Sequence, residues 1–419
     1  MIDVLIVGGG PAGCYTASLL GQKGFDVHVL EEHAVIGEPV DCSGIIGAEA
    51  FKELEVPCHL KHSEINQLSF VSPGNLEFQY SPGLPLAYLV DRAGFDRFIA
   101  EKAKNAGVTF HMGCQVVDLS VFDDGVELDI ANKLRSEEAI SFSSFPASQP
   151  PGRLMIEQLR LTNNARHERV MAKMAILAGG PRYALQKKLG MGEPRNYLKT
   201  AQVELPIKGI EQAKISLGCH VAPGSFSWIA PFRRGHRDFA RIGVSAKEAA
   251  GGFLQSRLKE LYCAGHIEST NVPIRSWMIP ITPLKRTFSD RVLAVGDAAG
   301  QTKPTTGGGI YYGILSAKAA ANTANLAFKT GDFSSATLRN YEKEWRKQIG
   351  PEVRRGAFFR KLFERLSDND IDDLFRVVQS DGILASVSKK ASFDWHRDVI
   401  NFILRHPELG KIFLRGLFR

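Results

Sequence analysis

The N-terminal segment begins with a short apolar run, continues with a longer amphipathic stretch, and returns to an apolar run. The first run covers residues 3–7, the amphipathic stretch 14–23 and the second run 27–30. Short apolar runs are typical of buried strands, and two strands joined by a helix form a parallel βαβ unit. We therefore predict a strand, a helix and a strand here, as in Rossmann-like α/β domains.

Apolar and polar residues alternate in two later segments. These are "LKTAQVELPI" (198–207) and "AKISLGCHVAP" (213–223). Alternation with a period of two favours strands with one buried and one exposed face, so an antiparallel sheet is expected there. The earlier segment "VDLSVFDDGVELDI" (117–130) is expected to be a hairpin that turns at Asp124-Gly125.

The last part of the chain, from Phe333 onward, has apolar residues at helical spacing. Examples are Phe358, Leu362, Phe363 and Leu366. In the final stretch "HPELGKIFLRGLFR", bases separate the apolar positions Leu409, Ile412, Phe413, Leu417 and Phe418. Two alternatives are open: this amphipathic end lies on a membrane surface, or its apolar face packs onto the protein itself.

Composition narrows the class of protein. The chain has 419 residues, of which 44% are apolar and 23% charged, as in soluble globular proteins. The six cysteines show neither a CxxC nor metal-ligand spacing, so no metal site is predicted and reduced thiols in the cytoplasm are expected. There is no leader-like N-terminus and no apolar run of the roughly 18 residues that a membrane span requires. We expect a protein that is neither secreted nor integral to a membrane.

The net charge of +7 is concentrated near the end of the chain, where residues 333–419 carry 17 Lys and Arg against 12 Asp and Glu. This surplus is compatible with peripheral contact to anionic lipid, with an acidic redox partner, or with an ordinary solvated surface. Nucleic acid is not expected as a partner, because the bases are interleaved with acids and no recognised motif is present.

A dinucleotide motif lies between the first two predicted strands. Its loop reads G-x-G-x-x-G, the helix follows it, and the second strand ends in an acid that is placed to bind an adenosine ribose. The glycines permit a tight turn, close approach to a pyrophosphate, and packing of the helix on the strand. The predicted binding residues are Gly8, Gly10, Pro11, Ala12, Gly13 and Glu31.

A second glycine-rich stretch, "RVLAVGDAAGQTKPTTGGGIYYG" (291–313), follows another apolar run. If residues 292–295 join the same sheet, Asp297 is placed to bind a ribityl hydroxyl, and the glycines begin a helix over 310–328. NAD has no use for a second site so late in the chain, so the two motifs together predict FAD. The binding residues predicted here are Gly296, Asp297, Gly307, Gly308, Gly309 and Ile310.

With both motifs, the chain resembles the geranylgeranyl reductase family, within the flavoproteins built like para-hydroxybenzoate hydroxylase. The resemblance implies that Arg92, in "LVDRAGFDRFIAEKAKNAGV", and Val116 contact FAD. It also implies that Cys42, in "EPVDCSGIIG", lies close to the isoalloxazine ring. At Gly179 the chain departs from relatives that have Asp before Gly180, which weakens the expectation of a family-like route for NAD(P)H.

The stretch "GSFSWIAPFRRGHRDFARIGVSA" (224–246) resembles the family's substrate-domain signature, with Phe226, Trp228 and Pro231 in place. Ala230 and Ser245 depart from it, and the pattern is also close to that of flavin halogenases. The resemblance implies an FAD domain from 1–62, 89–182 and 280–333, and a substrate domain from 63–88 and 183–279, followed by a helical region over 334–419. Within the second piece of the FAD domain, the Ser- and Pro-rich tract of an insertion at 131–154 is expected to be an exposed loop with no assigned role.

The expected activity is reduction of C=C bonds in geranylgeranyl or polyprenyl groups on a lipid, pigment or quinone. Hydride comes from reduced flavin and a proton from a nearby donor, for which Cys42 and Tyr311 are the candidates. The electron donor is NAD(P)H or a reduced ferredoxin. Alternatives are a flavin-dependent monooxygenase or halogenase, and a carrier without turnover. Phe226, Trp228, Phe232 and Tyr312 are the predicted substrate contacts.

Overall fold

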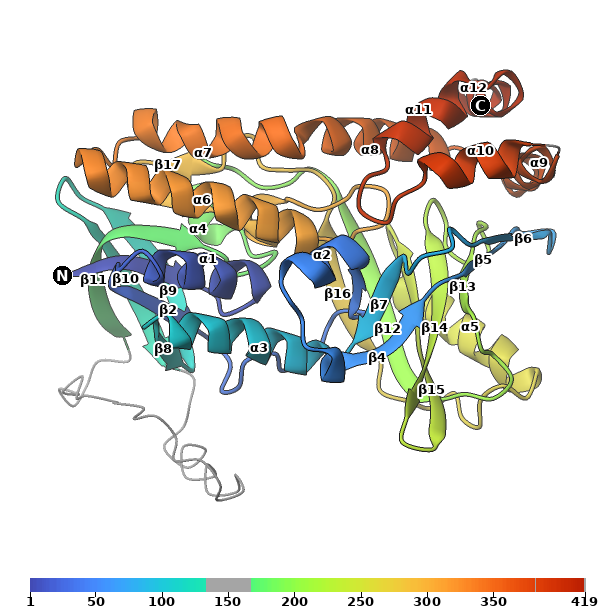
Figure 1. Cartoon of the computed structure of the whole chain (residues 1–419), viewed down its shortest axis with the longest axis horizontal. Coiled ribbons are helices and arrows are strands. Elements are labelled where there is room, and N and C mark those ends of the chain that lie inside the picture. The colour runs from blue at the N-terminus through green and yellow to red at the C-terminus, as the bar shows by residue number, and fades with distance from the viewer. Residues whose placement is uncertain (133–166, 381, 418–419) are drawn as a thin grey trace.

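The structure is a computed structural model that describes residues 1–132, 167–380 and 382–417 (Figure 1). The predicted N-terminal unit is present as β1 (Ile2–Val7), α1 (Pro11–Gly21) and β2 (Val27–Glu31), with β1 and β2 paired in parallel. Val4, Leu5 and Ile6 are fully buried, because β1 lies in the middle of its sheet. The α/β fold class expected from the sequence is confirmed.

Eight strands form the larger sheet. Its main path runs β17-β18-β11-β1-β2-β8, and β10 pairs with both β11 and β9. The predicted strand near residue 292 joins this sheet in parallel with β11, and the predicted hairpin is β9 and β10. The remaining bounds are β8 (Thr109–Met112), β9 (Cys114–Val121), β10 (Val126–Asn132), β11 (His167–Leu177), β17 (Phe288–Ser289) and β18 (Val292–Ala294).

Helices α3 (Arg92–Asn105) and α6 (Ile310–Thr330) pack against α1 beside this sheet (Figure 1). Alanines on α6 and apolar residues of β1 and β2 share one buried core. The short helices α2 (Ala48–Glu53) and α4 (Ala184–Lys188) complete this part of the molecule. These contacts fix the strand ends that carry both glycine-rich loops.

Seven strands form a second sheet in the order β16-β12-β15-β14-β13-β5-β6, antiparallel except for the β13–β5 pair. Helix α5 (Ala250–Cys263) covers one face through a separate apolar core. The strands are β5 (Leu68–Val71), β6 (Glu77–Tyr80), β12 (Tyr197–Pro206), β13 (Ala213–Ser216), β14 (Phe226–Arg234), β15 (Arg237–Ala246) and β16 (Arg275–Pro280).

A three-stranded sheet, β3 (Ile45–Gly47), β7 (Ala87–Val90) and β4 (Lys61–Ile65), lies between the two larger ones. The expected domain boundaries at 62/63 and 88/89 fall inside β4 and β7. Two of the pieces of chain that link the larger sheets are therefore strands of a shared small sheet rather than free linkers.

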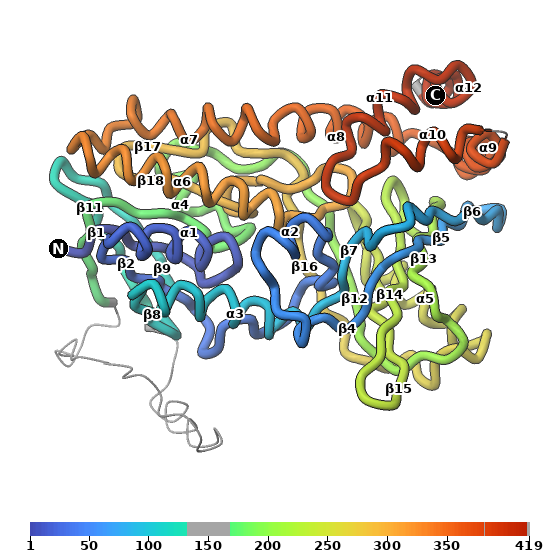
Figure 2. The backbone as a smooth tube through the Cα atoms, in the orientation of Figure 1, coloured from blue at the N-terminus to red at the C-terminus, as the bar shows by residue number. Residues whose placement is uncertain are grey.

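The C-terminal region is helical and lies along the top of the molecule as drawn in Figure 2, with the C-terminus at the opposite end from the N-terminus. Leu409, Ile412 and Phe413 are buried, the last two in a core shared with α8 and α9. These three residues therefore pack onto the protein itself, which is the second of the two alternatives for this amphipathic end. The helices are α7 (Ser335–Gln348), α8 (Gly350–Phe363), α9 (Asp368–Gln379), α10 (Ile383–Lys390), α11 (Arg397–Arg405) and α12 (Pro407–Leu417).

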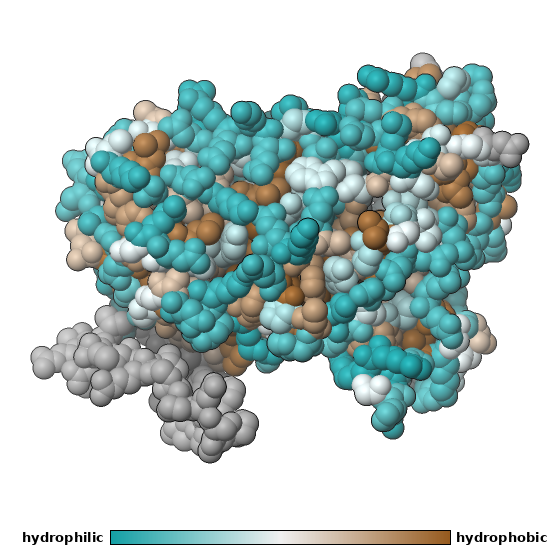
Figure 3. Space-filling model, viewed as in Figure 1, coloured by the Kyte–Doolittle hydropathy of each residue, from teal (hydrophilic) through white to brown (hydrophobic). Residues whose placement is uncertain are grey.

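Within the described part of the chain, no helix combines the length and the apolar character needed to cross a membrane. On the face drawn in Figure 3, polar and apolar side chains are intermixed, over the C-terminal helices as elsewhere. Residues 131–132 of the insertion expected over 131–154 are the end of β10, and the rest, with its Ser- and Pro-rich tract, lies outside the described residues.

Candidate active site

A large cavity of about 1070 Å³ runs through the molecule. It begins at the carboxyl ends of the central strands of the eight-stranded sheet and continues between the seven-stranded sheet and the C-terminal helices. Open α/β sheets bind their ligands at this edge. Both glycine-rich loops line this cavity, although about 290 residues separate them in the sequence.

The first glycine loop (residues 8–13) is built by backbone contacts that exclude side chains. Gly8 has φ of +105°, and a Cβ on Gly13 would overlap the carbonyl oxygen of Gly8. A Cβ on Gly10, by contrast, would meet nothing within 4 Å. Gly8 and Gly13 are thus required by the turn and the packing of α1, whereas the space at Gly10 is left for a ligand. Gly13 itself does not line the cavity.

Glu31, the predicted ribose ligand, lines the cavity but already holds the loop together. Its Oε2 accepts the Gly9 N–H at 2.6 Å, and its Oε1 accepts the His33 N–H at 3.0 Å. Oε1 also lies 2.6 Å from His33 Nδ1, whereas Oε2 keeps a further lone pair, so a ribose hydroxyl can still be accepted there. The acid at the end of β2 therefore orders the phosphate-binding turn as well as facing the ligand.

Asp297 occupies the place expected for a hydroxyl-binding acid. It follows β18, and its backbone carbonyl accepts the Tyr183 hydroxyl at 2.7 Å. Its carboxylate lines the cavity and has no hydrogen-bond partner among the residues that the structure describes. Burial raises the pKa of Asp297 to about 6, although Arg92 opposes the shift. An acceptor left unpaired inside a cavity is what a ribityl hydroxyl would satisfy.

The second glycine loop (residues 303–309) leads directly into α6. A Cβ on Gly309 would lie 2.7 Å from the Asp297 Oδ1, so a side chain there would displace the acid. Helix α6 begins at Ile310, and its first amide groups have no carbonyl partners within the helix. These amides and the helix dipole favour an electron-rich ligand edge at this end of the helix.

Arg92, Asp96 and the partly buried Cys42 lie together on the cavity wall. Arg92 and Asp96 are an ion pair one helical turn apart on α3. Burial lowers the pKa of Arg92, but the Asp96 carboxylate and the neighbouring Cys42 sulfur more than compensate and raise it. The Gly44 N–H also points to the Cys42 Sγ, at 3.5 Å. A permanent cation thus stands beside the thiol expected near the flavin.

Tyr311 lines the cavity, but its hydroxyl donates to Glu53 Oε2 at 3.0 Å. Burial, reinforced by the negative charge of Glu53, raises the pKa of Tyr311. Both effects make this phenol a poorer acid than a free tyrosine. This arrangement weakens the prediction of Tyr311 as a proton donor.

Two of the four predicted substrate contacts line the cavity and two do not. Phe226 and Trp228 line it. Phe232 lies further along β14, stacked on the His62 ring at 5.0 Å. Tyr312 is buried behind the wall, where its hydroxyl donates to the Asp394 carbonyl at 3.0 Å. Phe232 and Tyr312, which the sequence predicts as substrate contacts, therefore do not lie on the cavity wall.

An apolar chamber forms the far end of the cavity, and the sequence did not reveal it. One wall comes from β5, β6, β13 and β14, and the other from α8 to α11. Phe363 was noted for its helical spacing, but spacing alone could not show that it faces a cavity. The apolar residues of the chamber are Phe70, Phe78, Ile215, Leu217, Phe226, Phe359, Phe363, Val378, Leu384, Val387, Val399, Ile400 and Ile403.

The other predicted cofactor residues, Pro11, Ala12, Val116 and Gly296, also line the cavity. The open space at Gly10, the unpaired Asp297 carboxylate and the start of α6 suit a pyrophosphate, a ribityl chain and a flavin ring respectively. The residues present therefore fit FAD.

The family model described as "NAD(P)-binding Rossmann-like domain" matches residues 6–41. Digeranylgeranylglycerophospholipid reductase 2 of Methanothermobacter thermautotrophicus is 27% identical over 395 residues, which cover 92% of this chain and 94% of the relative. This likeness covers most of both chains.

Solved structures agree on the fold. A geranylgeranyl bacteriochlorophyll reductase-like protein from Thermoplasma acidophilum superposes with a TM-score of 0.78 at 20% identity, covering 99% of this chain and 98% of that one. The flavin-dependent halogenase CmlS gives a TM-score of 0.62 at 18% identity, covering 99% of this chain and 77% of that one. The comparisons confirm the resemblance to the geranylgeranyl reductase family and to flavoproteins more widely.

Proposed function

We propose that this homologue of the geranylgeranyl reductases is an FAD-dependent oxidoreductase that saturates C=C bonds of geranylgeranyl groups. One observation carries the proposal: the cavity that holds both glycine loops continues without interruption into an apolar chamber. A hydroxylase or halogenase of a small aromatic compound has no need of such a long apolar extension, whereas a prenyl chain does.

The chemistry requires a hydride on one alkene carbon and a proton on the other. FAD, once reduced, supplies the hydride. Asp297, the first glycine loop and the start of α6 hold the cofactor. Phe226 and Trp228 hold the alkene against the cofactor and exclude water, and the apolar chamber binds the rest of the prenyl chain.

Cys42 is proposed to give the proton at its Sγ. The thiol lies on the cavity wall, beside the Arg92 guanidinium. Tyr311 is the alternative donor, with its hydroxyl held by Glu53. A Cys42→Ser variant that keeps full activity would move the role to Tyr311.

The relative's name points to a phospholipid with two geranylgeranyl chains. We propose a prenylated lipid of this kind as the substrate, with a prenylated pigment or quinone as alternatives. The electron source is proposed to be NAD(P)H or a reduced ferredoxin, and the two are distinguished by which of them reduces the bound flavin.

The test is anaerobic incubation of the chemically reduced holoprotein with digeranylgeranylglycerophospholipid, followed by mass spectrometry. A gain of two hydrogen atoms per reduced bond supports the reductase. A product that forms only in air and carries added oxygen would instead indicate a monooxygenase, and one that carries halide would indicate a halogenase. Tight lipid binding without any product would indicate a carrier.

A further inference from the structure

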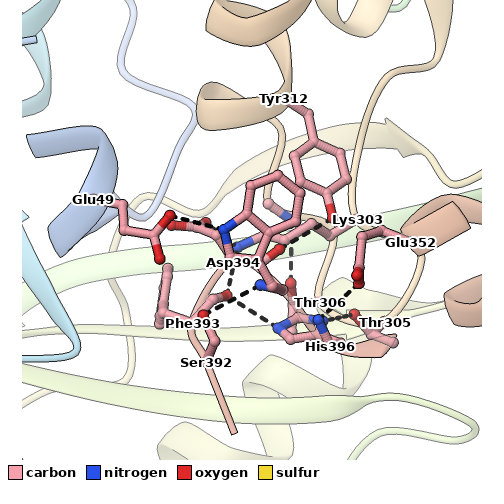
Figure 4. Close-up of polar contacts among 12 residues, drawn as sticks. Glu49, Lys303, Thr305, Thr306, Tyr312, Glu352, Ser392, Phe393, Asp394 and His396 are labelled. Carbon is pink, nitrogen blue, oxygen red and sulfur yellow. Dashed lines mark hydrogen bonds and ion pairs between the residues drawn. The ribbon is translucent and has the colours of Figure 1, made fainter. Parts of the chain in front are cut away.

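A buried ion pair joins the second glycine loop to the C-terminal helices. The partners are Lys303, in that loop, and Asp394, in residues 391–396, which connect α10 to α11 and are called the strap here (Figure 4). Lys303 Nζ donates to Asp394 Oδ1 at 2.8 Å and to the Phe393 carbonyl at 2.9 Å. The two side chains are only 5% and 4% exposed. Water therefore cannot replace either partner.

The other end of Lys303 shapes the glycine loop. Its N–H donates to the Gly308 carbonyl at 3.0 Å, and its carbonyl accepts the Gly307 N–H at 2.8 Å. A Cβ on Gly308 would lie 2.6 Å from the Lys303 Cε. The loop conformation and the position of the lysine side chain thus depend on one another.

A neutral histidine makes a second tie between the same two segments. His396 Nε2 lies 3.0 Å from the Phe393 carbonyl, which can only accept, so Nε2 carries the hydrogen. Its Nδ1 then accepts from the Thr305 hydroxyl at 2.5 Å (Figure 4). Glu352 on α8 accepts the His396 and Arg397 N–H groups at 2.9 and 2.8 Å, at the start of α11.

The strap also sets the position of the chamber wall. It is preceded by α10, which contributes Leu384 and Val387 to the cavity, and followed by α11, which contributes Val399, Ile400 and Ile403. These five residues are called the roof. Any shift of the second glycine loop is transmitted through Lys303 and Asp394 to the segment that holds both roof helices.

We propose that the Lys303–Asp394 pair couples the flavin site to the roof, so that cofactor binding tightens α10 and α11 over the substrate chamber. Lys303 is in this sense a positioning residue. The inference rests on the proposed function for the identity of the cofactor and the chamber. Linkage requires that the coupling work in both directions, so loosening the roof must weaken cofactor binding.

The test combines two measurements that need no turnover: FAD titration, and amide hydrogen exchange of α10 and α11 with and without FAD. In the wild type we expect FAD to slow exchange in both helices. In Lys303→Met we expect FAD to bind at least tenfold more weakly and the exchange in α10 and α11 to be the same with and without FAD. The control is Lys188→Met, which removes the cation of an exposed ion pair with Asp118, at 2.6 Å, between α4 and β9.

Thr305→Val tests the same idea without stranding a buried charge, and is informative even if Lys303→Met fails to fold. It removes the tie to His396, and we expect a partial loss of the FAD-dependent protection. Wild-type FAD affinity and wild-type protection in both variants would overturn the coupling. Wild-type protein that binds FAD without protection of α10 and α11 would overturn it too, while leaving prenyl reduction intact. Absence of prenyl reduction with the coupling present would overturn only the proposed function.

Discussion

At the scale of single residues, the site depends on a few polar groups. The fold gives some of them hydrogen-bond partners within the protein and leaves others for a ligand. Asp297 has an unpaired carboxylate in the cavity, Glu31 shares its oxygens between loop and ligand, and His396 is neutral between two fixed partners. Each of these states follows from burial, because a buried polar group must be satisfied either by the protein or by the ligand.

Asp297 is expected to be a main anchor of the cofactor. Hydrogen bonds to charged groups contribute about 1.5–3 kcal/mol, so Asp297→Ala should weaken FAD binding by roughly 10- to 100-fold. Titration of apoprotein with FAD, followed by flavin fluorescence, measures this. The exposed Asp124, in the turn between β9 and β10, provides the control Asp124→Ala. Equal affinities for the two variants would contradict the role given to Asp297.

His396 makes the stability of the protein depend on pH. Burial, with Lys303 adding to it, lowers the pKa of His396 from 6.5 to about 3. Below pH 6.5 the unfolded chain therefore binds a proton that the folded protein does not, and stability falls as the pH falls. The slope approaches about 1.4 kcal/mol per pH unit for one group.

The comparison is urea unfolding at pH 7.5 and pH 5.0. Between these two pH values, the free energy of unfolding of the wild type should fall by about 2 kcal/mol more than that of His396→Gln, since the variant has no imidazole to protonate. His236→Gln, at an exposed position, should behave like wild type. An identical loss in wild type and His396→Gln would show that this histidine titrates normally in the fold.

At the scale of elements, the sequence predicted the helices and strands that a local pattern of apolar and polar residues determines. The strand–helix–strand unit and the helix after the second glycine loop lie within a few residues of their predicted ends. Helical neighbours are about 100° apart, so Tyr311 and Tyr312 cannot both face one cavity, and the pattern alone could not say which does. Phe232 shares a strand face with Trp228 but lies beyond the end of the cavity.

Substitutions at Gly13 and Gly10 in the first loop should have different effects, the first on stability and the second on FAD binding. Gly13→Ala should lower the free energy of unfolding of the apoprotein by about 1–3 kcal/mol, because its Cβ overlaps the Gly8 carbonyl. Gly10→Ala should change it by less than about 1 kcal/mol but weaken FAD binding at least tenfold. Urea unfolding and FAD titration of both variants give the answer. If Gly10→Ala bound FAD as the wild type does, this loop would not be the binding site of the pyrophosphate.

At the scale of the whole molecule, function arises from segments that the sequence keeps far apart. The two glycine loops, the chamber wall of the second sheet and the C-terminal roof meet only in three dimensions. Lys303 and Asp394 are 91 residues apart, and no local signal marks either as part of the site. Sequence patterns therefore predicted the cofactor loops and missed the chamber and the strap.

Filling the chamber should lower the activity toward the substrate. Val387 faces the cavity from α10, and Val387→Trp, with its flavin site saturated with FAD, should have a kcat/KM for a geranylgeranyl lipid at least tenfold below that of the wild type. Ala385, exposed on the same helix, provides the control Ala385→Trp. Unchanged kcat/KM in Val387→Trp would mean that the prenyl chain does not occupy the chamber.

The most direct test of the account is a single turnover without oxygen. Holoprotein with chemically reduced flavin is mixed with digeranylgeranylglycerophospholipid, and the visible absorbance of oxidised flavin is followed. The account predicts that this absorbance returns with the unsaturated lipid and does not return with the fully saturated one. No return with either lipid, followed by a return only when air is admitted, would contradict it.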